Sequence, residues 1–156
     1  MIRTTLARGR FGRGQTLVEF ALTLPVILLL LFAAIDTARF VFSAATLQNA
    51  VRDATRLAIV NQTPEHILRR VVSESISLGL TPTAPKPVDV TYPDCTAPNI
   101  GVGCEIQVSA EYTFHTITPI ISTFIPETPM TATTVMPVEY VCPNANVASA
   151  QCPRQP

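Results

Sequence analysis

The chain has 156 residues, which leaves room for one small domain beside its most apolar segment. Eleven Lys and Arg balance eleven Asp and Glu, so the formal net charge favours neither nucleic acid nor an acidic partner. The sequence has two histidines and no nucleophile or phosphate-binding motif, which argues against an enzyme, a bound metal or cofactor, and a small-molecule substrate.

The first fourteen residues form a basic leader that ends at Gly14. They contain no acidic residue and four arginines, which are Arg3, Arg8, Arg10 and Arg13. Residues 1–13 have no hydrophobic period, so we expect them to be disordered or removed. Arginines beside a first membrane helix stay on the cytoplasmic side, which predicts a cytoplasmic N-terminus and places the chain beyond about residue 36 outside.

Residues 17–35 are almost entirely apolar. As a helix, these roughly 19 residues extend about 28 Å, close to the hydrocarbon thickness of a bilayer, which predicts a transmembrane helix. Pro25 lies within the segment and predicts a kink near residues 21–24, because proline removes a backbone donor. We expect the Thr23 hydroxyl or a neighbouring helix to compensate the freed carbonyl.

One carboxylate, Glu19, interrupts the apolar segment five residues after Gly14. At the centre of a membrane helix it costs roughly 2.5–3.5 kcal/mol, so we expect a functional role. The simpler alternative is a glutamate at the cytoplasmic edge that reaches water, which leaves the glycine and the arginines unexplained. If the chain is cut after Gly14, Glu19 lies one turn from the new ammonium of Gln15 and can neutralise it, or its counterpart on a neighbouring subunit.

The helix is expected to continue beyond the membrane, from about Gln15 to Val60. Asp36 and Arg39 mark the exit and are spaced to pair on one face. An amphipathic stripe follows at intervals of four and three, consisting of Phe40, Ala44, Leu47, Val51, Ala54 and Ala58. We expect this stripe to pack on a domain of the same chain.

The remaining chain predicts a short helix and a small antiparallel sheet, hence an α+β fold. Thr63 as N-cap and Pro64 as first residue begin the helix, and Gly79 ends it. Alternating residues predict three strands, at 88–92, 104–114 and 131–141, the last broken at Pro137. The apolar segment 117–125 is either a short helix under the sheet or an exposed contact surface.

Four cysteines lie in the part predicted to be exported: Cys95, Cys104, Cys142 and Cys152. An even count in an oxidising compartment favours disulfides, and four cysteines allow three pairings. The local pairing, 95–104 with 142–152, is preferred because each bridge closes a short loop, worth about 2.7 kcal/mol in the chain-entropy model. A zinc site is disfavoured because the usual ligand spacing is absent, and free thiols remain an alternative.

The basic leader, the Gly14 junction and Glu19 together resemble the processing signal of a class III (type IV pilin-like) prepilin. Residues 14–58 more broadly resemble the N-terminal segment of TadE-like proteins, the pseudopilins or minor pilins of the tight adherence (Flp-type) pilus system. The matching elements are Gly14, Val18-Glu19-Phe20-Ala21, Leu24-Pro25, the leucine run, Asp36, Leu47-Gln48-Asn49-Ala50 and Ala54-x-Arg56. The resemblance covers about 45 of the 156 residues and is specific as a set.

The resemblance implies a structural or assembly component that contributes to adhesion or secretion. A prepilin peptidase cuts such a chain between Gly14 and Gln15 and reads Glu19 and Phe20 as part of the signal. The implied partners are the bacterial cytoplasmic membrane, this peptidase, other pilins or pseudopilins, and the pilus assembly platform. The mature protein stays in the membrane or enters a pilus.

Two other interpretations remain open from the sequence. One is an unprocessed bitopic membrane protein with an extracytoplasmic binding domain, and the other is a secreted protein cut near residues 43–45. For the pseudopilin, the expected division is a leader at 1–14, a transmembrane helix at 15–36, its amphipathic continuation at 37–61 and an extracytoplasmic helix plus β domain at 62–156.

Overall fold

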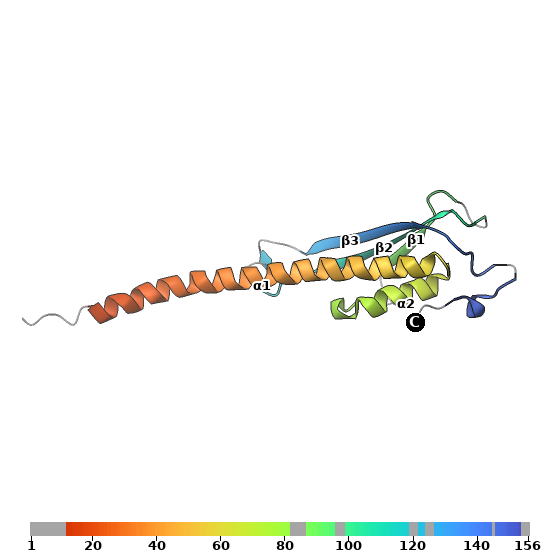
Figure 1. The fold of residues 1–156 in the computed structure, drawn as a ribbon. Coiled ribbons are helices and arrows are strands. Elements are labelled where there is room, and N and C mark those ends of the chain that lie inside the picture. The colour runs from red at the N-terminus through yellow and green to blue at the C-terminus, as the bar shows by residue number, and fades with distance from the viewer. Residues whose placement is uncertain are drawn as a thin grey trace, which may run out of the picture.

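A long helix carries a small α+β domain along its C-terminal half, as Figure 1 shows. The structure is a computed structural model that describes residues 12–81, 87–95, 99–118, 122–123, 127–144 and 146–153, with side chains from residue 14 onward. The predicted α+β class is confirmed by a long helix, a short helix and a three-stranded antiparallel sheet.

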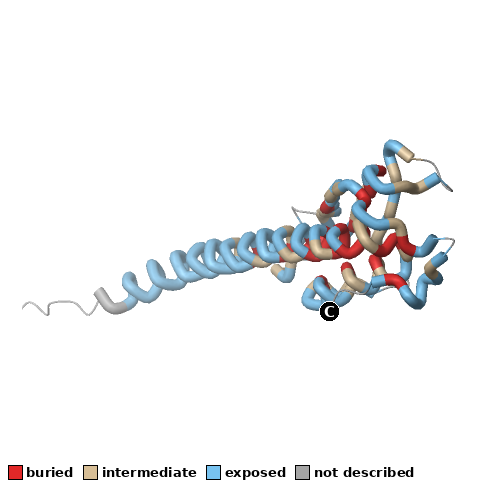
Figure 2. Tube along the Cα trace, turned by 45° about the vertical axis from the view of Figure 1, so that its right-hand side comes forward, coloured by how far each residue is buried: buried red, intermediate tan, exposed pale blue. Residues whose placement is uncertain are grey.

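Helix α1 runs from Gly12 to Ala58 without interruption, close to the expected range. Pro25 lies inside it and does not end it, so the kink there stays a prediction. Every described side chain from Gly14 to Phe32 is exposed, whereas buried side chains recur from Asp36 onward, as the tube in Figure 2 shows. The helix therefore has an unpacked N-terminal half and a half that belongs to the domain core.

Helix α2 spans Pro64–Glu74 and is followed by a short 3₁₀ helix, η1, at Ile76–Leu78. The sequence predicted one helix here, but α2 ends at Glu74 because the backbone of Ser75, at φ −109° and ψ 24°, leaves the helical conformation. The Ser75 amide and hydroxyl both donate to the Val71 carbonyl at this end. Thr63 occupies the N-cap position without a side-chain capping bond; instead its own amide donates to the Asn61 side chain at 3.0 Å. Gly79 closes the segment at a φ of 71°, a conformation that favours glycine.

The sheet has the order β1-β2-β3, with β1 at Val88–Thr91, β2 at Glu105–Phe114 and β3 at Thr128–Pro137. Strand β3 begins three residues earlier than predicted because it pairs with β2 along the full length of that strand, from Glu105 opposite Pro137 to Phe114 opposite Thr128. It ends at Pro137, which has no amide hydrogen for the ladder.

One face of the sheet packs on the helices, and α1 lies between the sheet and α2 in the view of Figure 1. The predicted stripe is confirmed from Leu47 to Ala58. Three residues of α1 outside the predicted stripe are also buried, namely Ala50, Thr55 and Leu57. The core consists mainly of Leu47, Ala50, Val51, Ala54, Ala58, Ile67, Val71, Ile106, Val108 and Ala110. The alanines of α1 let neighbouring elements approach its backbone closely.

Two disulfides lie at the end of the domain where α1 finishes, since the backbones of Cys104 and Cys142 bond there to Val138 and Gln62. They join Cys95 to Cys104 before β2 and Cys142 to Cys152 after β3, which is the local pairing that the sequence favoured. Cys142 and Cys152 are buried, so the second bridge also contributes apolar contacts.

Candidate functional site

The N-terminal half of α1 is the clearest functional feature because its apolar side chains are exposed in the part of the chain that the structure describes. An 18-residue window of this helix has a mean hydropathy of 2.5 and no buried residue. Among the described residues, α1 is the one helix that is long and apolar enough to cross a membrane. Such a continuous apolar surface needs a nonpolar environment, and a bilayer supplies one of the right thickness. The helix thus fits a membrane protein.

The predicted site residues lie on this exposed half. Gly14, Gln15, Glu19 and Phe20 occupy its first turns, and all four are exposed. Thr23 donates its hydroxyl to the Glu19 and Phe20 carbonyls at 3.0 and 3.2 Å. It therefore does not serve the Ala21 carbonyl, which loses its helical donor because Pro25 has no amide hydrogen, and a neighbouring helix stays the other predicted partner. The arginines of residues 1–11 lie outside the described residues.

The folded chain does not require a glycine at position 14. A Cβ atom added at this position meets no atom within 4 Å, and its φ is not among the positive values, which belong to Gly79 and Gly103 in the described chain. Neither packing nor backbone geometry of the folded chain explains the residue.

Asp36 is the first buried residue of α1 and joins the helix to the domain. Its carboxylate accepts the amide hydrogens of Ile117 and Thr118 at 3.2 and 3.3 Å and lies 3.6 Å from the Arg39 guanidinium. These three groups all offer hydrogen-bond donors to the carboxylate, so Asp36 holds the segment after β2 against α1.

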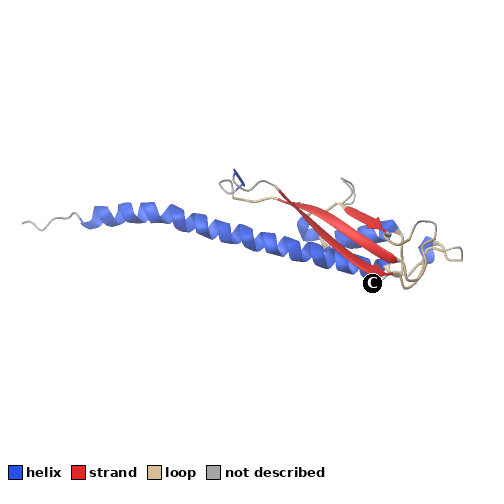
Figure 3. Cartoon of the chain, turned by 90° about the horizontal axis from the view of Figure 1, so that it is seen from above, coloured by secondary structure: helices blue, strands red, loops and turns tan. Residues whose placement is uncertain are grey.

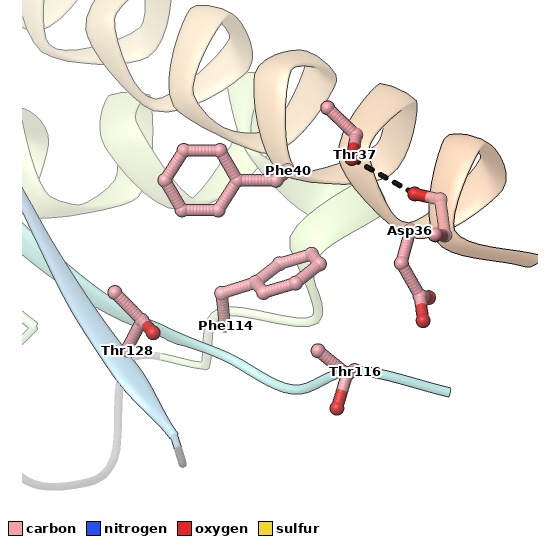
Figure 4. Close-up of a pocket in the computed structure, with 7 residues that line it drawn as sticks. Asp36, Thr37, Phe40, Phe114, Thr116 and Thr128 are labelled. Carbon is pink, nitrogen blue, oxygen red and sulfur yellow. Dashed lines mark hydrogen bonds between the residues drawn. The ribbon is translucent and has the colours of Figure 1, made fainter. Parts of the chain in front are cut away.

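A mostly apolar groove opens beside Asp36, between α1 and the ends of β2 and β3 (Figure 4). Phe40 and Phe114 meet edge to face, with ring centroids 5.4 Å apart and planes at 89°. The Arg39 guanidinium lies 5.6 Å from the centre of the Phe114 ring. The groove is lined by Ala33, Asp36, Thr37, Phe40, Phe114, Thr116 and Thr128.

Helix α1 is similar to a known protein family. Residues 14–56 match the family described as TadE-like protein. The chain carries a TadE-like helix. The match begins at Gly14, includes Glu19 and Asp36, and stops two residues before α1 ends. No curated protein and no solved structure matches the chain.

The match of the TadE-like helix confirms the resemblance that the sequence pattern indicated, and it lies wholly within α1. Half of the matched helix is exposed and half is packed in the core. Strands β1 to β3 lie wholly outside the match. The family match therefore concerns helix α1 alone.

The junction at Asp36 was only partly foreseen. The sequence predicted that Asp36 pairs with Arg39 and that residues 117–125 form a contact surface or a short helix. It gave no indication that Asp36 and residues 117–118 contact each other. Of that segment, the structure describes residues 117–118, where Ile117 is exposed, and 122–123; residues 119–121 and 124–125 lie outside the described part. The available signal was a carboxylate placed directly after an apolar span.

The histidines have ordinary surroundings. His66 Nδ1 lies 2.7 Å from the Asn61 side-chain nitrogen, and His115 Nδ1 lies 3.3 Å from Glu127. Within the described ranges, no three His, Cys, Asp or Glu side chains gather as metal ligands would.

Proposed function

We propose that this chain is a pseudopilin, or minor pilin, that acts as a membrane-anchored structural component of a tight-adherence pilus or a related secretion machinery. The observation that carries this proposal is the TadE-like match over residues 14–56, on a helix whose first half is apolar and fully exposed. The resemblance implies assembly and adhesion, with no catalytic role.

The proposed topology follows the expected division of the chain. The leader, residues 1–14, lies in the cytoplasm; residues 15–36 occupy the membrane; and residues 37–61 and 62–156 form the extracytoplasmic domain. The basic leader supports this orientation through the positive-inside rule. Two disulfides in the domain support it independently, because disulfides persist in oxidising compartments.

In this proposal, a prepilin peptidase cuts between Gly14 and Gln15 on the cytoplasmic side. The freedom around Gly14 supports this assignment, since the folded chain itself gives no reason for a glycine there. A glycine lets another protein approach the backbone closely. Glu19 and Phe20, in the next turn, complete the signal.

The exposed half of α1 also serves assembly. After cleavage, Glu19 lies four residues from the new ammonium of Gln15 and pairs with it or with that of a neighbouring pilin subunit. Inside a bilayer or a filament such a pair is worth far more than at a surface. Other pilins or pseudopilins and the assembly platform are the proposed partners of this helix.

The N-terminal residue and the intact mass of the protein from native membranes test the proposal. The expected chain begins at Gln15, and Gly14→Leu is expected to keep the leader although the structure has space for the side chain. Leu22→Val, at an exposed position about two turns further along the helix and outside the matching elements, is the control and should be cut normally.

A wild-type chain that keeps its arginine leader in cells with an active prepilin peptidase contradicts the proposal. The protein is then better described as an unprocessed bitopic anchor with an extracytoplasmic binding domain. A cut near residues 43–45 indicates a secreted protein instead.

A further inference from the structure

The end of the domain that faces the N-terminal half of α1 is held to the helix at Asp36. The hairpin end of β2 and β3 points toward the N-terminal half of α1, as Figures 1 and 3 show. Its backbone is held there because Asp36 accepts hydrogen bonds from the Ile117 and Thr118 amides. Ile117 therefore lies at the same height along the helix as Asp36.

That height can be compared with the thickness of a bilayer. Residues 17–35 fill a hydrocarbon core of about 30 Å, so Asp36 lies at its outer boundary. The headgroup layer beyond extends about 5–7 Å, which is roughly four residues of helix. This layer therefore covers α1 from Asp36 to Phe40, together with whatever is packed beside these residues.

The side chains at this end suit a headgroup layer. Ile117 is 68 % exposed although it is apolar, and the groove between Phe40 and Phe114 has a mostly apolar lining (Figure 4). Arg39, whose side chain is 41 % exposed, lies above the Phe114 ring. Aromatic rings and arginines with apolar stems are favoured where lipid meets water.

We propose that the end of the domain around Asp36 and Ile117 is immersed in the headgroup layer of the outer leaflet, where phospholipid contacts Ile117 and fills the groove between Phe40 and Phe114. This inference rests on the proposed membrane anchoring. Lipid is favoured over a second copy of the chain because the groove and Ile117 lie within the headgroup layer for as long as the helix spans the bilayer.

The immersed end also sets the depth of the anchor. Glu19 lies seventeen residues before Asp36, which corresponds to about 25 Å of helix. When Asp36 is at the outer boundary, Glu19 is within reach of the cytoplasmic boundary of a core about 30 Å thick. The domain thus acts as a stop that presents Glu19 near the cytoplasmic face.

The chain has no tryptophan, so a single substitution introduces a unique fluorophore. We would place it at Ile117→Trp, at Val102→Trp and at Phe32→Trp in the full chain, reconstituted in phosphatidylcholine–phosphatidylglycerol vesicles. These vesicles carry nitroxide-labelled lipids with the label on the headgroup or in the acyl chain. All three native side chains are substantially exposed, at 68 %, 71 % and 46 %, so each site accepts the larger ring.

Val102 is the matched control because it lies at the opposite end of the domain. Its neighbour Gly103 donates to the Val138 carbonyl, and the next residue after Val138 donates to the Ile59 carbonyl. Ile59 is 23 residues beyond Asp36, about 34 Å along the helix direction. Ile117→Trp is expected to show a blue-shifted emission and several-fold stronger quenching by headgroup-labelled lipid than Val102→Trp.

The other outcomes overturn the inference, and they separate it from the proposed anchoring. If only Phe32→Trp is quenched, the anchor stands and the domain is clear of the membrane. If none of the three is quenched, the membrane anchor fails and the inference fails with it. A blue-shifted but unquenched Ile117→Trp shows that protein, such as a second copy, covers this surface instead of lipid.

Discussion

Gln62 and Cys142 bind each other through reciprocal hydrogen bonds. The Gln62 amide donates to the Cys142 carbonyl at 2.7 Å, and the Cys142 amide donates to the Gln62 side-chain oxygen at 2.7 Å. The Gln62 side-chain nitrogen also donates to the carbonyls of Ala58 and Tyr140. One buried side chain therefore joins the end of α1 to the segment that follows β3, eighty residues later.

Gln62→Ala is expected to destabilise the domain by about 2–4 kcal/mol, because it leaves buried backbone groups without partners. The measurement is chemical unfolding of the full chain in detergent, followed by circular dichroism. Gln48→Ala is the control, since Gln48 is a glutamine exposed on α1 and its loss should cost less than about 0.5 kcal/mol. Equal midpoints for the two variants contradict the proposed role of Gln62.

The Cys142–Cys152 disulfide closes a short loop next to this hydrogen-bonded pair. Replacement of both cysteines by serine should lower the free energy of unfolding by about 2.7 kcal/mol, the chain-entropy value for a loop of this length. Comparison of the variant with the wild type under oxidising and reducing conditions checks this. A variant as stable as the oxidised wild type indicates that the bridge contributes nothing to stability.

Asp36 uses both carboxylate oxygens at the junction, Oδ1 for the Ile117 amide and Oδ2 for the Thr118 amide. An asparagine has one acceptor oxygen, so Asp36→Asn leaves one of the two amides facing an NH2 group. Asp36→Asn should therefore destabilise the domain by about 1–3 kcal/mol, measured by chemical unfolding of the full chain in detergent.

Asp53→Asn is the control for Asp36→Asn, because Asp53 lies on the same helix with an exposed arginine partner, Arg56. Its removal should change stability little, since exposed pairs contribute up to about 1 kcal/mol. An unfolding midpoint of Asp36→Asn equal to that of Asp53→Asn argues against a role for the Asp36 carboxylate at the junction.

Glu19→Ala should leave membrane insertion intact, because it makes the span more apolar, but should impair processing, assembly or both. The fraction of protein in the membrane, the intact mass and incorporation into pili measure the three properties separately. Glu19→Gln keeps the shape without the charge and shows whether the charge is required. Normal cleavage and incorporation of Glu19→Ala rule out the proposed role of this carboxylate.

Local patterns determined most of the elements. Apolar spacing located both halves of α1, alternation located β1 and β2, and Thr63, Pro64 and Gly79 set the limits of the segment that contains α2 and η1. These features follow from the chain's own periodicity and its proline and glycine residues, which act within a few residues of sequence. The short spacing within each cysteine pair likewise favoured the observed bridges.

Tertiary structure decided what these elements contact. Strand β3 begins at Thr128 because β2 offers a partner along its whole length, and no local signal carries that information. In the sequence, Gln62 is a polar residue after a helix, and Asp36 is a carboxylate after an apolar span. In the folded chain, Gln62 binds Cys142 and Asp36 binds Ile117, each about eighty residues away. A buried polar group takes the partner that the packed chain provides, and sequence distance gives no measure of which partner that is.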